Sequence, residues 1–173
     1  MKSTKKMIKK LKILWAIACT SSSIDQNSNV TSLFNVLEQV QFSTSSPEVV
    51  KNGIPENGTG IPFPFDIVAL IARPRPYQTN KELQLEIKLK LTDPEGKILI
   101  TNDFPAVIDK DKKRLRFNIR FNGMTVTKNG EYIFTLSVKE KDTESFVDSV
   151  EIPLDVTLEF ISPYVVSKKH EQN

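Results

Sequence analysis

The sequence predicts an all-β fold, an antiparallel immunoglobulin-like β-sandwich of about eight strands, and three observations support this prediction. Several segments alternate apolar and polar side chains with a period of two, which is typical of half-buried strands. Clusters of Pro, Gly, Asn and Asp separate these segments. No segment has a convincing helical period, so two packed sheets are the expected architecture.

Composition indicates one domain of ordinary size. The chain has 173 residues, of which 39% are hydrophobic and 26% charged, within the range of globular domains. The net charge of +3 is too small to indicate a nucleic-acid-binding protein. We expect a lysine-rich leader over residues 1–12, a single sandwich domain over 13–160 and a flexible C-terminal tail over 161–173. No apolar stretch approaches the roughly 20 residues of a transmembrane segment.

The stretch "ILWAIACTSSSIDQNSNVTSLFNVLEQV", residues 13–40, has two interpretations. A lysine-rich leader followed by an apolar run and a cysteine resembles a bacterial lipoprotein signal, in which Cys19 would become the acylated N-terminus of an envelope protein. However, the uninterrupted apolar run before Cys19 covers only residues 13–18, whereas a signal core usually has about 7–15 residues.

The second interpretation is an N-terminal β-hairpin, and the sequence favours it. Residues 13–20 have the length of a strand, and the turn formers of "SSSIDQNSN" follow. Residues 32–42 alternate, with four apolar side chains expected on one face of one strand: Phe34, Val36, Val40 and Phe42. Cys19 is then a small buried strand residue, the usual environment of a free cysteine.

The remaining strands follow in order along the chain. Residues 43–62 are interrupted by Pro and Gly and predict a long surface loop, whereas "FDIVALIAR" (65–73) is apolar on both faces and predicts a covered central strand. "ELQLEIKLKL" (82–91) has the clearest alternation and, across the turn "TDPEGK", pairs with "KILITN". Further alternating strands are "KRLRFNIRF", "NGEYIFTLSVK" and "SFVDSVEIPLDVTLEF"; in the last, Pro153 predicts an edge strand.

Tyr132 predicts a specific structural feature. It opens an inward-alternating strand two residues after Gly130. This arrangement is typical of the tyrosine corner of immunoglobulin-like sandwiches, in which the phenol bonds to backbone a few residues upstream. The alternative is an ordinary core tyrosine.

Four motifs resemble a family of uncharacterised bacterial β-sandwich proteins, a domain of unknown function. They are "AIACTSSSIDQNSNVTSLFNVLEQV", "PFPFDIVAL", "LKLTDPEGK" and "KNGEYIFTLSV", and together they span residues 16–138. The resemblance implies the sandwich fold and the N-terminal hairpin, and it implies no activity, so no functional residue follows from it.

The inventory of reactive side chains argues against an enzyme. The one histidine, His170, lies near the C-terminus, so the serines at 21–23 lack an activating base. Spacing alone selects no carboxylate pair for glycoside hydrolysis. Calcium could be held by acidic residues of two loops, but interleaved lysines would repel it; these acids are Asp109, Asp111, Asp142 and Glu144. We expect no catalytic residue, no metal site and no cofactor.

Three arginines form the one surface that the sequence offers for a contact. Arg114, Arg116 and Arg120 occupy even positions of one predicted strand and would form an anion or partner patch. Alternatively, they pair across a sheet with Glu82 and Glu86 and contribute little.

These observations predict a non-enzymatic binding module in the cytoplasm. Its expected partner is another protein or a second copy of itself, with no specific nucleic acid. The lipid-anchored envelope protein remains the alternative.

Overall fold

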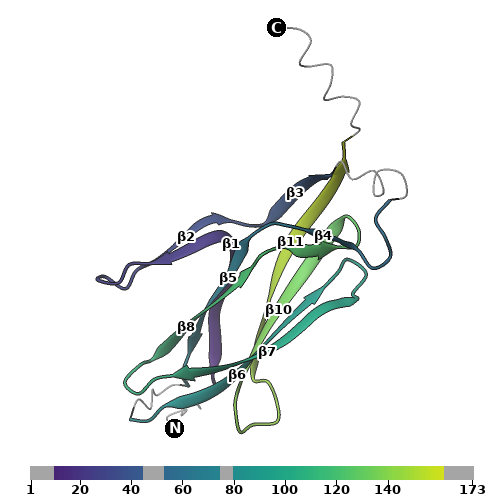
Figure 1. The fold of residues 1–173 in the computed structure, drawn as a ribbon. Helices are drawn as coiled ribbons and strands as arrows, with labels where there is room; N and C mark the ends of the chain where they lie inside the picture. The colour runs from purple at the N-terminus through teal and green to yellow at the C-terminus, as the bar shows by residue number, and fades with distance from the viewer. Residues whose placement is uncertain (1–9, 45–52, 75–79, 162–173) are drawn as a thin grey trace, which may run out of the picture.

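The computed structural model describes residues 10–44, 53–74 and 80–161, and the regular structure in these ranges consists of strands (Figure 1). The strands are β1 (Lys12–Ile24), β2 (Thr31–Val36), β3 (Gln39–Thr44), β4 (Thr59–Ile61), β5 (Phe65–Ala72), β6 (Leu83–Thr92), β7 (Ile98–Ile108), β8 (Arg114–Phe121), β9 (Met124–Val126), β10 (Gly130–Glu140) and β11 (Asp148–Phe160).

Two sheets pack face to face, which confirms the predicted all-β sandwich. One sheet has the order β2-β1-β5-β8, and the other has the order β3-β11-β10-β6-β7. Neighbouring strands are antiparallel except β3 and β11, which run parallel. A short antiparallel pair, β4 with β9, completes the described sheets. The eleven described strands exceed the predicted eight, because one predicted strand is divided and the short strands β4 and β9 lie outside the predicted strands.

The core lies between the inner faces of the two sheets. The alternation predicted for residues 82–91 is present in β6, where the odd-numbered residues of 85–91 are at most 1% exposed. Phe65 of β5 lies at the centre of an aromatic cluster: its ring centroid is 4.8 Å from that of Phe121, 5.8 Å from that of Phe63 and 5.8 Å from that of Phe134. Leu11, inside the predicted leader, is also buried, so the core begins before residue 13.

The predicted N-terminal hairpin is present, but its second strand differs from the prediction. Residues 32–42 form two strands, because the chain leaves one sheet after β2 and enters the other at β3. Asn35, with a φ of 48°, interrupts the extended backbone just before this change of sheet. As a result, Phe34 and Val36 are exposed, whereas Val40 and Phe42 pack against the core.

Two further expectations need correction. The predicted loop over residues 43–62 contains β4, which pairs with β9. Pro153 does not mark β11 as an edge strand throughout, because β3 pairs with β11 from Asp155 onward. Only the first half of β11, which includes Pro153, lacks a strand partner on that side among the described residues. The predicted tail, apart from residue 161, and most of the predicted leader lie outside the described residues.

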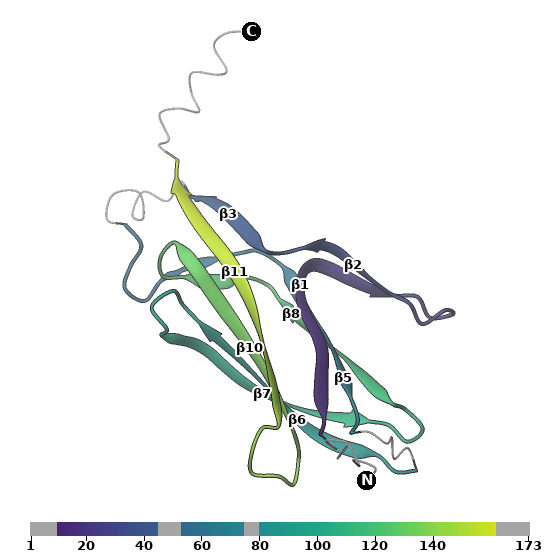
Figure 2. The ribbon, with the colours of Figure 1, turned by 180° about the vertical axis from the view of Figure 1, so that it is seen from behind.

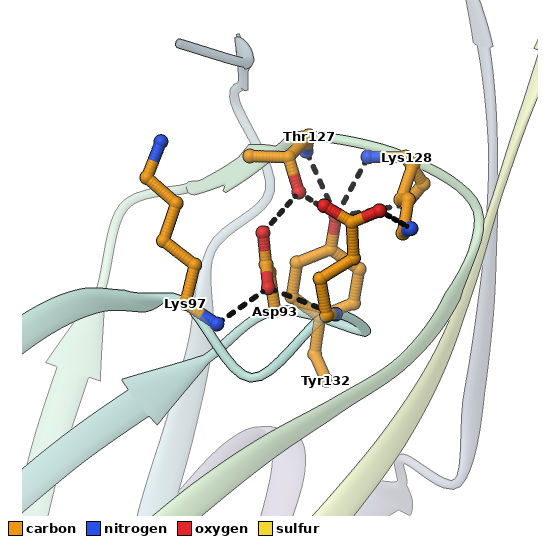
Figure 3. A network of polar contacts seen from close by, with 6 residues as sticks. Asp93, Lys97, Thr127, Lys128 and Tyr132 are labelled. Atoms are coloured by element: carbon orange, nitrogen blue, oxygen red, sulfur yellow. Dashed lines mark hydrogen bonds and ion pairs between the residues drawn. The ribbon is translucent and has the colours of Figure 1, made fainter. Parts of the chain in front are cut away.

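Tyr132 has the hydrogen bonds of a tyrosine corner (Figure 3). Its buried hydroxyl donates to the carbonyl oxygen of Lys128 at 2.8 Å and accepts from the backbone N–H of Thr127 at 2.8 Å. The Thr127 hydroxyl in turn donates to Asp93 Oδ2 at 3.0 Å. The turn after β6 is therefore joined to the connection between β9 and β10, which closes this end of the sandwich.

Asp93 is the acceptor at the centre of this network. Burial alone would raise the pKa of its carboxyl group, but hydrogen bonds outweigh this effect and the pKa is lowered. The donors are the backbone N–H groups of Lys97, at 2.9 Å, and Glu95, at 3.0 Å, together with the Thr127 hydroxyl. The positive charge of Lys128, whose ammonium group pairs with Glu95, acts in the same direction.

The Asp93→Asn variant is expected to be less stable than the natural protein by about 1–3 kcal/mol near neutral pH, because hydrogen bonds to a charged acceptor are lost. Since the pKa of Asp93 is lower in the folded state, its contribution is complete above the unfolded pKa of about 3.9 and disappears as pH falls through the folded value. Urea denaturation of both proteins from pH 7 to pH 3 measures the difference in their free energies of unfolding at each pH. A stability difference that stays constant over the whole range would contradict the account.

Candidate functional site

The N-terminal hairpin forms an arm on one sheet of the sandwich. β1 pairs with β5 as far as Cys19, which lies opposite Asp66; beyond this point it pairs only with β2. The hairpin therefore extends away from the body of the sandwich, as the two views from opposite sides show (Figures 1 and 2). We call residues 20–36 the arm.

The arm combines exposed apolar side chains with a single charge and a free strand edge. Four large hydrophobic side chains are about half exposed on it: Ile24 (49%), Val30 (56%), Phe34 (49%) and Val36 (53%). Asp25 is its only charged residue. β2 is the last strand of its sheet, so its outer backbone edge has no strand partner among the described residues. Such an edge can accept an added strand.

The arm is held against the sheet at two places. Near its base, the backbone N–H and the hydroxyl of Ser22 donate to Asp66 Oδ2 at 2.9 and 2.8 Å, and Asn118 Nδ2 donates to Ser22 Oγ at 2.8 Å. At its tip, the guanidinium group of Arg116 donates to the backbone oxygen of Asn29 at 3.0 Å and to its Oδ1 at 3.2 Å. The arm is thus fixed by β5 and β8 rather than free to swing.

The turn at the tip is also ordered internally. Asp25 Oδ1 accepts hydrogen bonds from the backbone N–H groups of Ser28, at 2.6 Å, and Asn27, at 2.9 Å. These bonds lower the pKa of the Asp25 carboxyl group, and the bond from Ser28 has the largest effect. Val30, which follows this Asx turn and directly precedes β2, is exposed.

Cys19 is fully buried in the middle of β1, where the hairpin interpretation expected a strand residue. Burial raises the pKa of its thiol, and the nearby negative charge of Asp66 raises it further. The neutral thiol is therefore the stable form, and Cys19 lacks the thiolate character of a reactive cysteine.

The three arginines of the predicted patch lie on β8, the edge strand of the same sheet, but they have different surroundings. Arg120 pairs with the buried Asp66 at 3.8 Å, and Arg116 holds Asn29. Arg114 is exposed, and its side chain makes no hydrogen bond or ion pair within the described part of the chain. The three therefore do not form one free row.

The proposed pairing of these arginines with Glu82 and Glu86 is wrong. Glu82 directly precedes β6 and Glu86 lies within it, and β6 belongs to the other sheet. Glu86 pairs with Lys139 at 3.3 Å. Asp66, which the sequence reasoning did not single out, is the partner of Arg120 instead. A single acid inside the apolar segment "FDIVALIAR" was the available signal, because a buried carboxylate requires partners.

A hollow of about 440 Å³ lies beside Arg114 and Arg116. Its wall combines basic and apolar side chains from β5, β7, β8, the turn between β7 and β8, and the tip of the arm. The lining residues are Asn29, Leu70, Val107, Ile108, Asp109, Lys112, Arg114, Leu115 and Arg116.

The acidic loops considered for calcium do not converge. Among residues 10–44, 53–74 and 80–161, no three His, Cys, Asp or Glu side chains gather in a group that could hold a metal ion. The same residues contain no helix with the length and apolar character needed to cross a membrane.

Comparison with known proteins gives only general similarities of fold. No protein-family model matches the chain, and no curated protein matches it. A β-glucuronidase of Bacteroides uniformis aligns at 10% identity over 57% of this chain and 12% of that chain, with a TM-score of 0.45. A family 123 glycoside hydrolase of Clostridium perfringens covers 86% of this chain and 27% of that one, at 10% identity and a TM-score of 0.43. The alignment with the N-terminal domain of PorA covers 82% of this chain and 97% of that chain, at 9% identity and a TM-score of 0.28.

Proposed function

We propose that this chain is a non-enzymatic binding module that docks a protein partner through the arm. The observation that carries the proposal is the set of exposed apolar side chains on an uncharged edge strand. Protein contact surfaces are depleted of charge and enriched in aromatic residues at their centre, which matches Phe34 and its neighbours.

The edge of β2 differs from the other edges of the two sheets. Edge strands are usually protected by charged residues or proline. β8 carries three arginines, and β7 carries Asp103 and Pro105. β3 is uncharged, but its apolar side chains pack against the core. β2 has no charge and no proline, and its apolar side chains Phe34 and Val36 are exposed.

The expected mode of binding is addition of a strand. A strand of the partner would hydrogen-bond to the free edge of β2, and its apolar side chains would cover those of the arm. The bonds from Ser22 and Asn29 to the sheet fix the arm beforehand, so little conformational entropy is lost on binding.

The test is photo-crosslinking in the native host from a benzoylphenylalanine placed at Phe34. The matched control places the same group at Ile98, which is 58% exposed on edge strand β7. A discrete crosslinked protein from position 34 that is absent from position 98 is the expected result. A second copy of this chain in that product would identify the partner as itself. The same products from both positions, or none from position 34, would overturn the proposal.

The proposal includes the cytoplasmic location and the membership of an uncharacterised bacterial sandwich family expected from the sequence. The lipid-anchored alternative would require cleavage before Cys19, which would remove every residue of β1 that pairs with β5 except Cys19 itself. It would also remove Leu11 and Ile13 from the core and break the bond between the Ile13 N–H and Asp148, 2.6 Å long. These contacts support an intact hairpin.

A further inference from the structure

We infer that the hollow beside β8 binds an anionic group, a carboxylate or a phosphate, carried on a ligand with an apolar portion. This site is separate from the edge of β2, and the inference does not depend on the proposed docking of a partner there.

The charge of the lining favours an anion. Three cationic side chains, Lys112, Arg114 and Arg116, line the hollow, against one acid, Asp109. Lys112 and Arg114 make no side-chain hydrogen bond or ion pair with any residue that the structure describes. Their charges are therefore available to a ligand, and the planar fork of an arginine matches the geometry of carboxylate and phosphate oxygens.

A fourth cation, the buried Arg73, hydrogen-bonds to the backbone of residues that line the hollow. It is only 4% exposed. Its guanidinium group donates to the carbonyl oxygens of Ile108 at 2.7 Å, Asp109 at 2.9 Å and Lys112 at 2.8 Å. These bonds fix the turn between β7 and β8, so Lys112 is presented on a rigid backbone. The buried charge of Arg73 also adds to the positive potential of the hollow.

The apolar part of the lining defines the rest of the ligand. Leu70, Val107, Ile108 and Leu115 contribute to the wall. The volume of about 440 Å³ is within the range of small-molecule sites, about 300–1,000 Å³. A ligand with one anionic group and one apolar group the size of a ring would use both parts.

The tip of the arm forms the rim of the hollow. Arg116 holds Asn29 through two hydrogen bonds, and both residues line the hollow. A bound anion would therefore lie next to the contact that fixes the tip, and the backbone N–H of Asn29 should report its binding.

The test is a titration of the full ¹⁵N-labelled protein, followed by NMR, with phenyl phosphate and, separately, with benzoate. Benzyl alcohol, which has the ring but no charge, is the third probe. Saturating shift changes at Asn29 and at residues 112–116 are expected for at least one of the two anions and absent for benzyl alcohol. The stronger of the two anions identifies the ligand as a phosphate or a carboxylate.

Two matched double variants complete the experiment. Lys112→Gln with Arg114→Gln is expected to weaken anion binding by about tenfold or more, because two charge-assisted bonds are lost. The control variant, Lys90→Gln with Lys97→Gln, loses the same charge from β6 and from the turn between β6 and β7. It should bind the anion as tightly as the natural protein does. Because all four side chains lie outside the core, both variants should retain the native spectrum. Equal affinity of the two double variants, equal shifts with benzyl alcohol, or no saturable shifts at Asn29 and residues 112–116 would overturn the inference.

Discussion

Replacing Phe65 with alanine is expected to lower the free energy of unfolding by about 3–5 kcal/mol. Phe65 is fully buried, and its ring contacts those of Phe63, Phe121 and Phe134. These neighbours come from both sheets and from the segment before β5, so the cavity left by the ring cannot close without moving several elements. Urea denaturation followed by circular dichroism measures the loss.

Phe34→Ala is the matched control for this prediction. Phe34 is also a strand phenylalanine, but it is 49% exposed on the arm. Its replacement should change the free energy of unfolding by about 0.5 kcal/mol or less, the usual effect of a surface substitution. Similar losses in the two variants would mean that the aromatic cluster around Phe65 is not the centre of the core.

The Cys19 thiol is expected to react with a disulfide reagent about a thousandfold more slowly in the native protein than in urea. Full burial blocks access to the sulfur, and the raised pKa reduces the thiolate that would attack. Absorbance of the released chromophore measures both rates.

The control for this prediction places the one thiol at an exposed position of β1 instead of a buried one. In a Cys19→Ala, Ser23→Cys double variant, the thiol occupies an exposed position of the arm and should react at nearly the unfolded rate. Rapid modification of Cys19 in the native natural protein would show that β1 is not held in the sheet there.

Most strands could be predicted from the sequence, because a period of two determines which side chains face the core. β6 and β10 follow their predicted alternation residue by residue. The division of residues 32–42 could not be predicted this way. Phe34, Val36, Val40 and Phe42 all occupy even positions, which predicts one shared face, although Glu38 lies between the two pairs. The change of sheet after β2 exposes the first two.

The candidate site was predicted only in part, for a related reason. Alternation correctly places Arg114, Arg116 and Arg120 on one face of a strand. It cannot tell which strands are neighbours, and the partners Asp66 and Asn29 come from β5 and from the tip of the arm. The exposed edge of β2 and the hollow beside β8 both arise from sheet order, which the local pattern does not encode.

The intact hairpin is the central claim of this account, since both the arm and its edge depend on it. The mass of the protein purified from its native host tests it most directly. We expect a chain that retains residues 10–18 and carries an unmodified Cys19. A chain that begins at Cys19 and bears a diacylglycerol would contradict the account.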